Sequence, residues 1–370
     1  MSDGGRRNGF LFIADISGYT AFLTGTELEH AQGIIEDLVA VIHSALVPAL
    51  ELVKLEGDAL FCYADAARFT DGERLLELIE SCYYEFRARL EQMKRATTCT
   101  CAACASSDTL DLKFAAHYGE FLVREMAGVQ DLAGPDVILV HRLLKNAVSA
   151  DTGLRGYALV TDACAAFMPV TGTWPRRVEH VESMADVNCV LYDLAPSVAV
   201  RKAAHRIFVE PADADFAFKA RLPAPPVAVW QYWVEADKAV RWENDLKSVT
   251  FERNAEGRMA DGAVGHCDHG GWASDMRFVD WRPFSYFTLE RTIPRSSFVA
   301  APPATETLEL VPLEDGATEL HYRIRATRSS GRLKLRLFGP MVQRNFRRQV
   351  NRLEKALQED QSSEGRPPDR

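Results

Sequence analysis

Between Phe10 and Leu194 the chain alternates short apolar runs with amphipathic stretches, and this order constrains the fold more than any other feature. Apolar residues recur at helical spacing within 26–46 and 72–94. Shorter runs such as 10–14 are typical of buried strands, and the run 110–127 predicts a pair of strands that turns near Gly119. The order of strand, helix, two strands, helix, two strands, helix and strand predicts an α+β fold, in which helices pack on an antiparallel-rich sheet.

The pattern of apolar and polar residues changes after Leu194. A chain of 370 residues is long enough for two domains. The second half begins with a β-like run, and Pro225-Pro226 then opens a helix. Further β-like runs and a final amphipathic helix follow. We therefore expect one domain over 8–194, a linker over 195–213, a second domain over 214–358 and a disordered tail over 359–370.

Composition excludes several classes of protein. Hydrophobic residues at 47% and charged residues at 26% are globular values. No apolar run reaches the roughly 18 residues of a membrane helix, and no signal peptide is evident, so we expect a cytoplasmic protein. A net charge of −9 argues against nucleic acid as a partner. Eleven Lys and Arg stand against Glu354 alone between Arg323 and Lys355, which indicates either a solvated helix face or an anionic partner.

Two aspartates stand where strands are predicted to end. Asp15 directly follows the buried run 10–14, and Asp58 lies in a predicted hairpin turn. If these strands are neighbours, both carboxylates lie at one edge of the sheet. Two like charges held together are costly unless a cation joins them, and carboxylate oxygens suit Mg²⁺ or Mn²⁺. The alternative is a pair of unrelated, solvated turn residues.

Other polar residues accompany this pair. The segment after Asp15 offers small residues and free backbone N–H groups before a helix, which is a place that can hold phosphate. Lys54 precedes Asp58 by four positions. The candidate binding residues are Ser17, Gly18, Tyr19, Thr20, Lys54, Asp131 and Arg142.

Taken together, segments 10–20, 54–61, 112–120 and 131–143 resemble the class III nucleotidyl cyclase domain in order and content. The resemblance implies a ferredoxin-like cyclase domain with an antiparallel-rich sheet. It implies that Asp15 and Asp58 hold two metal ions per site, Mg²⁺ or Mn²⁺. It also implies that Lys54 and Asp131 read the adenine of ATP, and that Arg142 stabilises phosphate charge in the transition state.

In this family the ribose 3′-hydroxyl attacks the α-phosphate, and cyclic AMP and pyrophosphate form. Metal carboxylates come from one subunit and base-reading residues from the other, so a head-to-tail homodimer is implied. One departure concerns Ile138, which stands where the family has an asparagine that orients the ribose. Loss of a positioning contact can cost on the order of 10²-fold in rate. A slow cyclase, a cyclase that positions ribose differently, and a nucleotide-binding domain without turnover all remain open.

Eight cysteines without a secretory signal indicate reduced thiols. Cys99, Cys101 and Cys104 supply three soft ligands, which favours either Zn²⁺ or free, redox-active thiols. A similar cysteine-rich insert is typical of an uncharacterised subgroup of cyclase-like proteins. A fourth ligand must come from elsewhere, with Cys62, Cys82 and His117 as candidates.

The second half is rich in aromatic residues, since five of the six tryptophans fall between Trp230 and Trp281. Its order of strand, short helix, several strands and long helix resembles the START/polyketide-cyclase (SRPBCC) helix-grip family. The resemblance implies a curved antiparallel sheet around a long C-terminal helix, and a cavity for an apolar small molecule or lipid. The aromatic side chains can also fill that space as core. Three functions stay open: a cyclase regulated by this ligand, a sensor without turnover, and a lipid carrier with a dimerisation scaffold.

Overall fold

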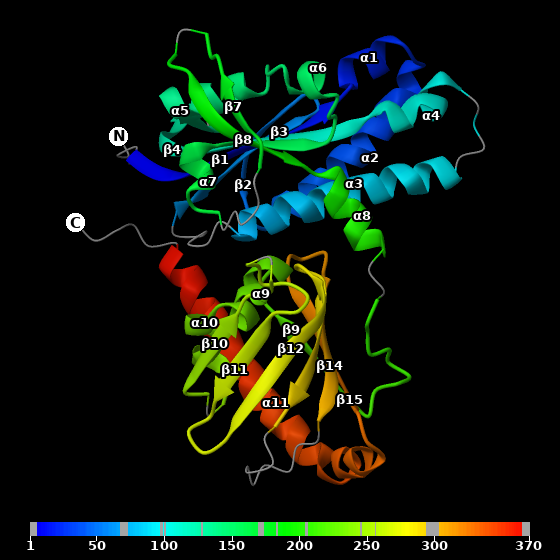
Figure 1. Cartoon of the computed structure of the whole chain (residues 1–370), viewed down its shortest axis with the longest axis vertical. Coiled ribbons are helices and arrows are strands. Elements are labelled where there is room, and N and C mark those ends of the chain that lie inside the picture. Colours follow the sequence, from blue (N-terminus) through cyan, green and yellow to red (C-terminus); the bar gives the residue numbers. More distant parts are fainter. Residues whose placement is uncertain are drawn as a thin grey trace. The chain divides into compact units, whose positions relative to one another are not determined.

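The computed structural model forms two compact units, Met1–Ala204 and His205–Arg370 (Figure 1). Both units combine helices with an antiparallel-rich sheet, which confirms the predicted α+β class. Within the described part of the chain, no helix has the length and apolar character needed to cross a membrane. The structure describes residues 6–66, 73–96, 99, 101–126, 129–168, 174–182, 184–203, 206–244, 246–255, 257–293 and 303–364.

An eight-stranded sheet lies at the centre of the N-terminal unit, in the order β2-β3-β1-β4-β6-β8-β7, with β5 paired to β4. All pairs are antiparallel except β4 with β6. The strands are β1 (Arg6–Ser17), β2 (Glu51–Glu56), β3 (Ala59–Asp65), β4 (Asp111–Met126), β5 (Val129–Ala133), β6 (Tyr157–Thr161), β7 (Arg176–Glu179) and β8 (Val187–Asp193).

Helices follow each strand group in the order that the sequence predicts. The predicted helices at 26–46 and 72–94 correspond to α2 and α3. Helix α8 lies inside the stretch predicted as a linker, and its Arg201 packs over the ring of Tyr84 on α3. The helices are α1 (Tyr19–Thr24), α2 (Leu28–Leu46), α3 (Glu73–Ala96), α4 (Ala102–Ser106), α5 (Pro135–Leu143), α6 (Val148–Thr152), α7 (Asp162–Ala165) and α8 (Ala195–Ala203).

Strand β1 is buried on both faces. Leu11 and Ile13 join one core cluster with residues of α5. Phe10 and Phe12 point to the opposite face because side chains alternate along a strand, and they are equally buried. Helix α2 contacts β3, and α3 contacts β4. This burial fixes the register of β1 and therefore the position of the carboxylate near its end.

Strand β4 differs from the sequence prediction of a turn near Gly119. The strand passes through Gly119 without a break, and its antiparallel partner β5 follows after Met126. The residue at position 119 has to be small because the carboxylate of Asp136 lies against the strand there. This carboxylate accepts a hydrogen bond from the N–H of Glu120 at 2.7 Å. A Cβ at position 119 would collide with that carboxylate. Gly119 therefore permits a close approach.

The C-terminal unit holds a seven-stranded antiparallel sheet in the order β10-β11-β12-β13-β14-β15-β9. The long helix α11 (Ser329–Glu364) runs along the sheet and contacts β9 and β15 (Figure 1). This arrangement confirms the predicted helix-grip layout. The other elements are β9 (Phe216–Leu222), α9 (Pro226–Val234), α10 (Ala236–Trp242), β10 (Ser248–Glu252), β11 (Val264–Asp268), β12 (Ala273–Arg282), β13 (Tyr286–Thr292), β14 (Ala304–Pro312) and β15 (Thr318–Ala326).

Helix α11 continues to Glu364, beyond the point where the sequence predicts a disordered tail. Asp360 explains the extension. It accepts hydrogen bonds from the hydroxyl of Tyr232 at 2.6 Å and from Arg241 Nη1 at 2.7 Å. These contacts tie the last turns of α11 to α9 and α10. Residues 365–370 lie outside the described part of the chain.

Candidate functional site

Asp15 and Asp58 converge at the end of β1. Asp15 lies opposite Lys113 of β4, whose Nζ is 3.1 Å from Asp15 Oδ2. Asp58 lies in the β2–β3 turn and is only 8% exposed. Burial and then the negative charge of Asp15 raise the pKa of Asp58 to about 7, although the N–H groups of Asp58 and Ile16 and the charge of Lys113 oppose the rise. The two carboxylates are therefore close enough to repel each other.

This pair fits a hard divalent cation. Carboxylate oxygens are the ligands that Mg²⁺ and Mn²⁺ prefer. The pKa of Asp58 is raised by burial first and by the charge of Asp15 second, and the nearby charge of Lys113 does not offset these two effects. A bound cation would supply the missing charge and favour the ionised form of Asp58.

The segment after Asp15 is arranged around Gly18. Gly18 adopts a left-handed conformation, with φ of 89°, directly before α1. The hydroxyl of Ser17 donates to the carbonyl of Arg155 at 3.1 Å, so Ser17 already has a partner. Tyr19 is half-buried and Thr20 is exposed. Because the Ser17 hydroxyl already has an acceptor, a phosphate at this segment would contact the backbone N–H groups or the hydroxyls of Tyr19 and Thr20.

Lys54 lies on β2 and Asp131 on β5, two strands that contact each other without pairing in the sheet. Burial raises the pKa of Asp131, but the hydrogen bond from Arg124 and the charge of Lys54 lower it below its ordinary value. Lys54 Nζ also lies 2.8 Å from Glu56 Oε1, and Arg124 Nη2 lies 3.1 Å from Asp131 Oδ2. The structure thus brings Lys54 and Asp131 together. Sequence reasoning missed their neighbours Glu56 and Arg124.

Arg142 lies near the end of α5. Its Nη1 atom is buried and has no hydrogen-bond partner among the described residues. Ile138, one turn earlier, is 53% exposed. The adjacent His141 packs its ring edge-on against Phe61 at 4.5 Å, and its Nε2 lies 3.4 Å from Glu56 Oε2. Arg142 is therefore a cation with hydrogen-bonding capacity to spare.

A buried histidine on β4 was not predicted as part of this region. His117 is 6% exposed. Its Nδ1 lies 2.9 Å from Thr161 Oγ1, and its Nε2 lies 3.3 Å from Asp136 Oδ1. Burial lowers the pKa of His117, against the opposing charge of Asp136. Once β1 and β4 are paired, their register places Lys113 directly opposite Asp15. The periodicity of the sequence does not indicate that Asp136 contacts β4.

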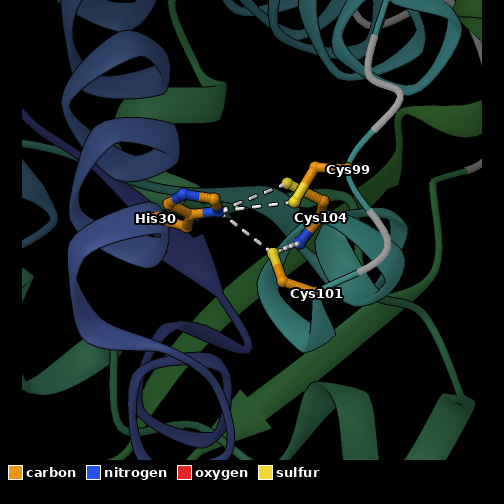
Figure 2. Close-up of side chains that lie close together, drawn as sticks. All are labelled: His30, Cys99, Cys101 and Cys104. Carbon is orange, nitrogen blue, oxygen red and sulfur yellow. Dashed lines mark hydrogen bonds between the residues drawn. The ribbon is translucent and has the colours of Figure 1, made fainter.

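A histidine and three cysteines of the N-terminal unit lie close together (Figure 2). His30 lies in the first turns of α2, Cys101 caps α4, and Cys104 lies within α4. His30 Nδ1 is 3.1 Å from the sulfur of Cys101, 3.6 Å from that of Cys99 and 4.0 Å from that of Cys104. These four residues form a group that could hold a metal ion.

The fourth member of this cluster differs from those that the sequence suggests. Cys62 and Cys82 are fully buried on β3 and α3, and burial raises the pKa of both thiols. His117 contacts Thr161 and Asp136 instead. The fourth member of the cluster is His30, although it lies far from the three cysteines in the sequence. Helical periodicity predicts that α2 forms. It does not predict which distant residues lie next to the first turn of that helix.

The C-terminal unit contains a cavity of about 80 Å³. Glu243 and Arg291 give its mainly apolar wall a polar part. Arg291 Nε donates to Glu306 Oε1 at 2.9 Å, and burial raises the pKa of Glu243 although the charge of Arg291 opposes the rise. Its lining includes Trp233, Trp242, Phe278, Phe287, Phe346 and Tyr322. The aromatic residues of this half therefore leave some space open.

Family comparisons divide the chain into the same halves. Residues 213–358 match the family described as polyketide cyclase / dehydrase and lipid transport. Residues 35–152 match a family described as protein of unknown function (DUF2652). An uncharacterised protein of Mycobacterium tuberculosis (strain ATCC 25618 / H37Rv) is 38% identical over 128 residues, which are 35% of this chain. The match spans 57% of that relative's length.

Similar solved structures include cyclases. A bacterial light-regulated adenylyl cyclase gives a TM-score of 0.39 at 14% identity, over 51% of this chain and 53% of its own. The adenylyl cyclase CyaB from P. aeruginosa gives 0.40 at 15% identity, over 51% of this chain and 94% of its own. The helix-grip resemblance predicted from the sequence thus has a counterpart in the family that residues 213–358 match. At this level of similarity, the activity of the chain has to be argued from its own residues.

Proposed function

We propose that the N-terminal unit binds ATP with two divalent cations, Mg²⁺ or Mn²⁺, and converts it to cyclic AMP and pyrophosphate. The observation that carries this proposal is the convergence of Asp15 and Asp58, where burial and the charge of Asp15 raise the pKa of Asp58 to about 7. Such a carboxylate pair is suited to a cation-dependent reaction on a polyphosphate.

Each candidate residue has a distinct task in this proposal. Asp15 and Asp58 would hold the ions, which neutralise the triphosphate and lower the pKa of the ribose hydroxyl. Lys54 donates to the adenine ring and Asp131 accepts from its amino group. Arg142 directs the hydrogen-bonding capacity of its buried Nη1 toward the phosphate charge that develops during the reaction. Backbone N–H groups near Gly18 contact the phosphates.

The active form in this proposal is a head-to-tail homodimer. Within one chain, Asp15 and Asp58 interact with each other and with Lys113, while Lys54 interacts with Asp131. We propose that the carboxylate pair of one copy faces the base-reading residues of the second. Two equivalent sites then form across one symmetric interface.

A sensor that binds ATP without turnover is the second candidate. The exposed, apolar side chain of Ile138 favours it, because a hydrocarbon cannot hydrogen-bond the ribose. Calorimetry with Mn²⁺ and ATP separates the two candidates when product is measured in the same sample. Binding with cyclic AMP formation supports the cyclase, binding without product supports the sensor, and no binding contradicts both.

The C-terminal unit, in the same proposal, regulates the first by holding an apolar small molecule or lipid. Its cavity offers a mainly apolar wall for an apolar body and Glu243 for a polar group. Because burial raises the pKa of Glu243, its protonated form can donate a hydrogen bond. Mass spectrometry of molecules extracted from the purified chain tests this. An apolar compound retained by the native chain and lost on Phe346→Trp, which narrows the cavity, would support it; equal retention by both would contradict it.

A further inference from the structure

We propose that His30, Cys99, Cys101 and Cys104 bind one Zn²⁺ ion, which joins the start of α2 to the segment between α3 and β4. This site is separate from the carboxylate pair of the proposed cyclase reaction. Its ligands are three sulfur atoms and one imidazole nitrogen, whereas Asp15 and Asp58 offer only oxygen. The two sites therefore select different metals.

The distances within the cluster match a tetrahedral zinc site. Zinc lies about 2.3 Å from sulfur and about 2.0–2.1 Å from nitrogen, so the nitrogen and a sulfur of one tetrahedron are about 3.6 Å apart. The three separations from His30 Nδ1 are 3.1, 3.6 and 4.0 Å, and they scatter around that value. All four candidate ligand atoms lie within 4.8 Å of one another. One ion can therefore reach all four with small side-chain adjustments.

The backbone around the cluster is already positioned for this task. The N–H of Cys104 points at the sulfur of Cys101, at 3.4 Å. A backbone N–H donor in this position can remain hydrogen-bonded to the sulfur when the sulfur binds a metal ion, and it then orients that ligand. Glu27, just before α2, accepts hydrogen bonds from the N–H groups of Ala102 and Ala103 at 3.3 and 3.1 Å. Helices α2 and α4 are thus held together by contacts that do not depend on the sulfur atoms.

The number of protein ligands indicates the role of the ion. A Cys₃His set fills all four positions of tetrahedral zinc and leaves none for substrate, which is typical of structural sites. His30 and Cys104 lie on different helices, and the cysteines lie far from His30 in the sequence. Binding therefore closes a long loop of chain and stabilises the folded form, since the unfolded chain does not hold these ligands together.

The test is metal analysis of the full chain, purified without a histidine tag. We expect one zinc per native chain, and loss of that zinc in His30→Ala and in Cys101→Ser. The matched control is His43→Ala, which removes an exposed histidine from the other end of α2 and should keep the zinc. Cobalt added to the zinc-free chain should give the absorption of tetrahedral thiolate coordination, and this band should be absent in His30→Ala.

Three results would overturn the proposal. The first is a native chain that contains no zinc and binds neither zinc nor cobalt. The second is a disulfide between cysteines of the cluster in protein kept under reducing conditions, found by mass spectrometry. The third is a His30→Ala chain with the same zinc content as the native one. Asp15→Ala keeps its zinc on this account, so failure of the cyclase reaction and failure of the zinc site are measured independently.

Discussion

At the scale of single residues, Asp58 links stability to metal binding. Its pKa is about 7 in the folded chain, against an ordinary value of 3.8. Between these pH values the folded chain keeps a proton that the unfolded chain releases. Stability therefore falls as pH rises from about 4 to about 7, because the unfolded state binds fewer protons there. At higher pH, the cost of burying ionised Asp58 beside Asp15 remains unless a cation neutralises the pair.

Asp58→Asn should remove both the cost of burying this charge and one of the two proposed metal ligands. Without metal at pH 8, we expect the variant to unfold at a higher temperature than the native chain, because its amide has no charge to bury. Mn²⁺ should raise the unfolding temperature of the native chain but not that of the variant. Thermal unfolding at pH 5 and pH 8, with and without Mn²⁺, measures both effects. Asp65→Asn, at the other end of β3, is the control.

A lower unfolding temperature for metal-free Asp58→Asn at pH 8, together with an undiminished response to Mn²⁺, would contradict this account of Asp58. Asp65→Asn should respond to Mn²⁺ as the native chain does, because Asp65 pairs with Arg7 away from the carboxylate pair.

Ile138 gives a second prediction at this scale. Ile138→Asn should increase cyclic AMP formation, on the order of 10²-fold if the amide regains the ribose contact. The substitution is tolerated because the side chain is 53% exposed. Initial rates at saturating ATP and Mn²⁺ measure the effect, with Ile138→Ala as control. Equal rates for the two variants would show that ribose positioning does not limit this domain.

At the scale of elements, the amphipathic pattern of α11 predicts which residues support the C-terminal unit. Leu353 is completely buried against the sheet, whereas Leu337 on the same helix is 67% exposed. Leu353→Ala should reduce the free energy of unfolding by about 2–5 kcal/mol. Leu337→Ala should change it by no more than about 0.5 kcal/mol. Chemical denaturation of the full chain measures both, and similar losses would contradict the packing of α11.

Sequence patterns predicted the elements better than the contacts between distant ones. The spacing of apolar residues was enough to predict α2 and α3, and the β-rich runs on either side of Gly57-Asp58 were enough to predict the β2–β3 hairpin, because each signal is local. The turn expected near Gly119 was wrong, because that glycine makes room for Asp136 rather than for a bend. His30 was missed for a similar reason. Its approach to Cys101 depends on how two helices pack, which no local pattern records.

At the scale of the whole molecule, the proposed dimer makes a prediction about mixed chains. Asp58→Asn lacks an intact carboxylate pair, and Arg142→Ala lacks the phosphate-binding cation, so each alone should be inactive. Equal mixing should restore about a quarter of native activity, because half of the dimers are mixed and each has one complete site. Cyclic AMP formation after co-refolding measures this. A mixture no more active than its components would argue against sites shared between two copies.

The central claim is that the carboxylate pair of the N-terminal unit supports nucleotide cyclisation. The most direct measurement is incubation of the full chain with ATP and Mn²⁺, followed by detection of cyclic AMP and pyrophosphate by mass spectrometry. The account predicts both products in equal amounts from the native chain, and neither from Asp15→Ala that unfolds at a normal temperature. Absence of product from the folded native chain, or an equal yield from Asp15→Ala, would contradict it.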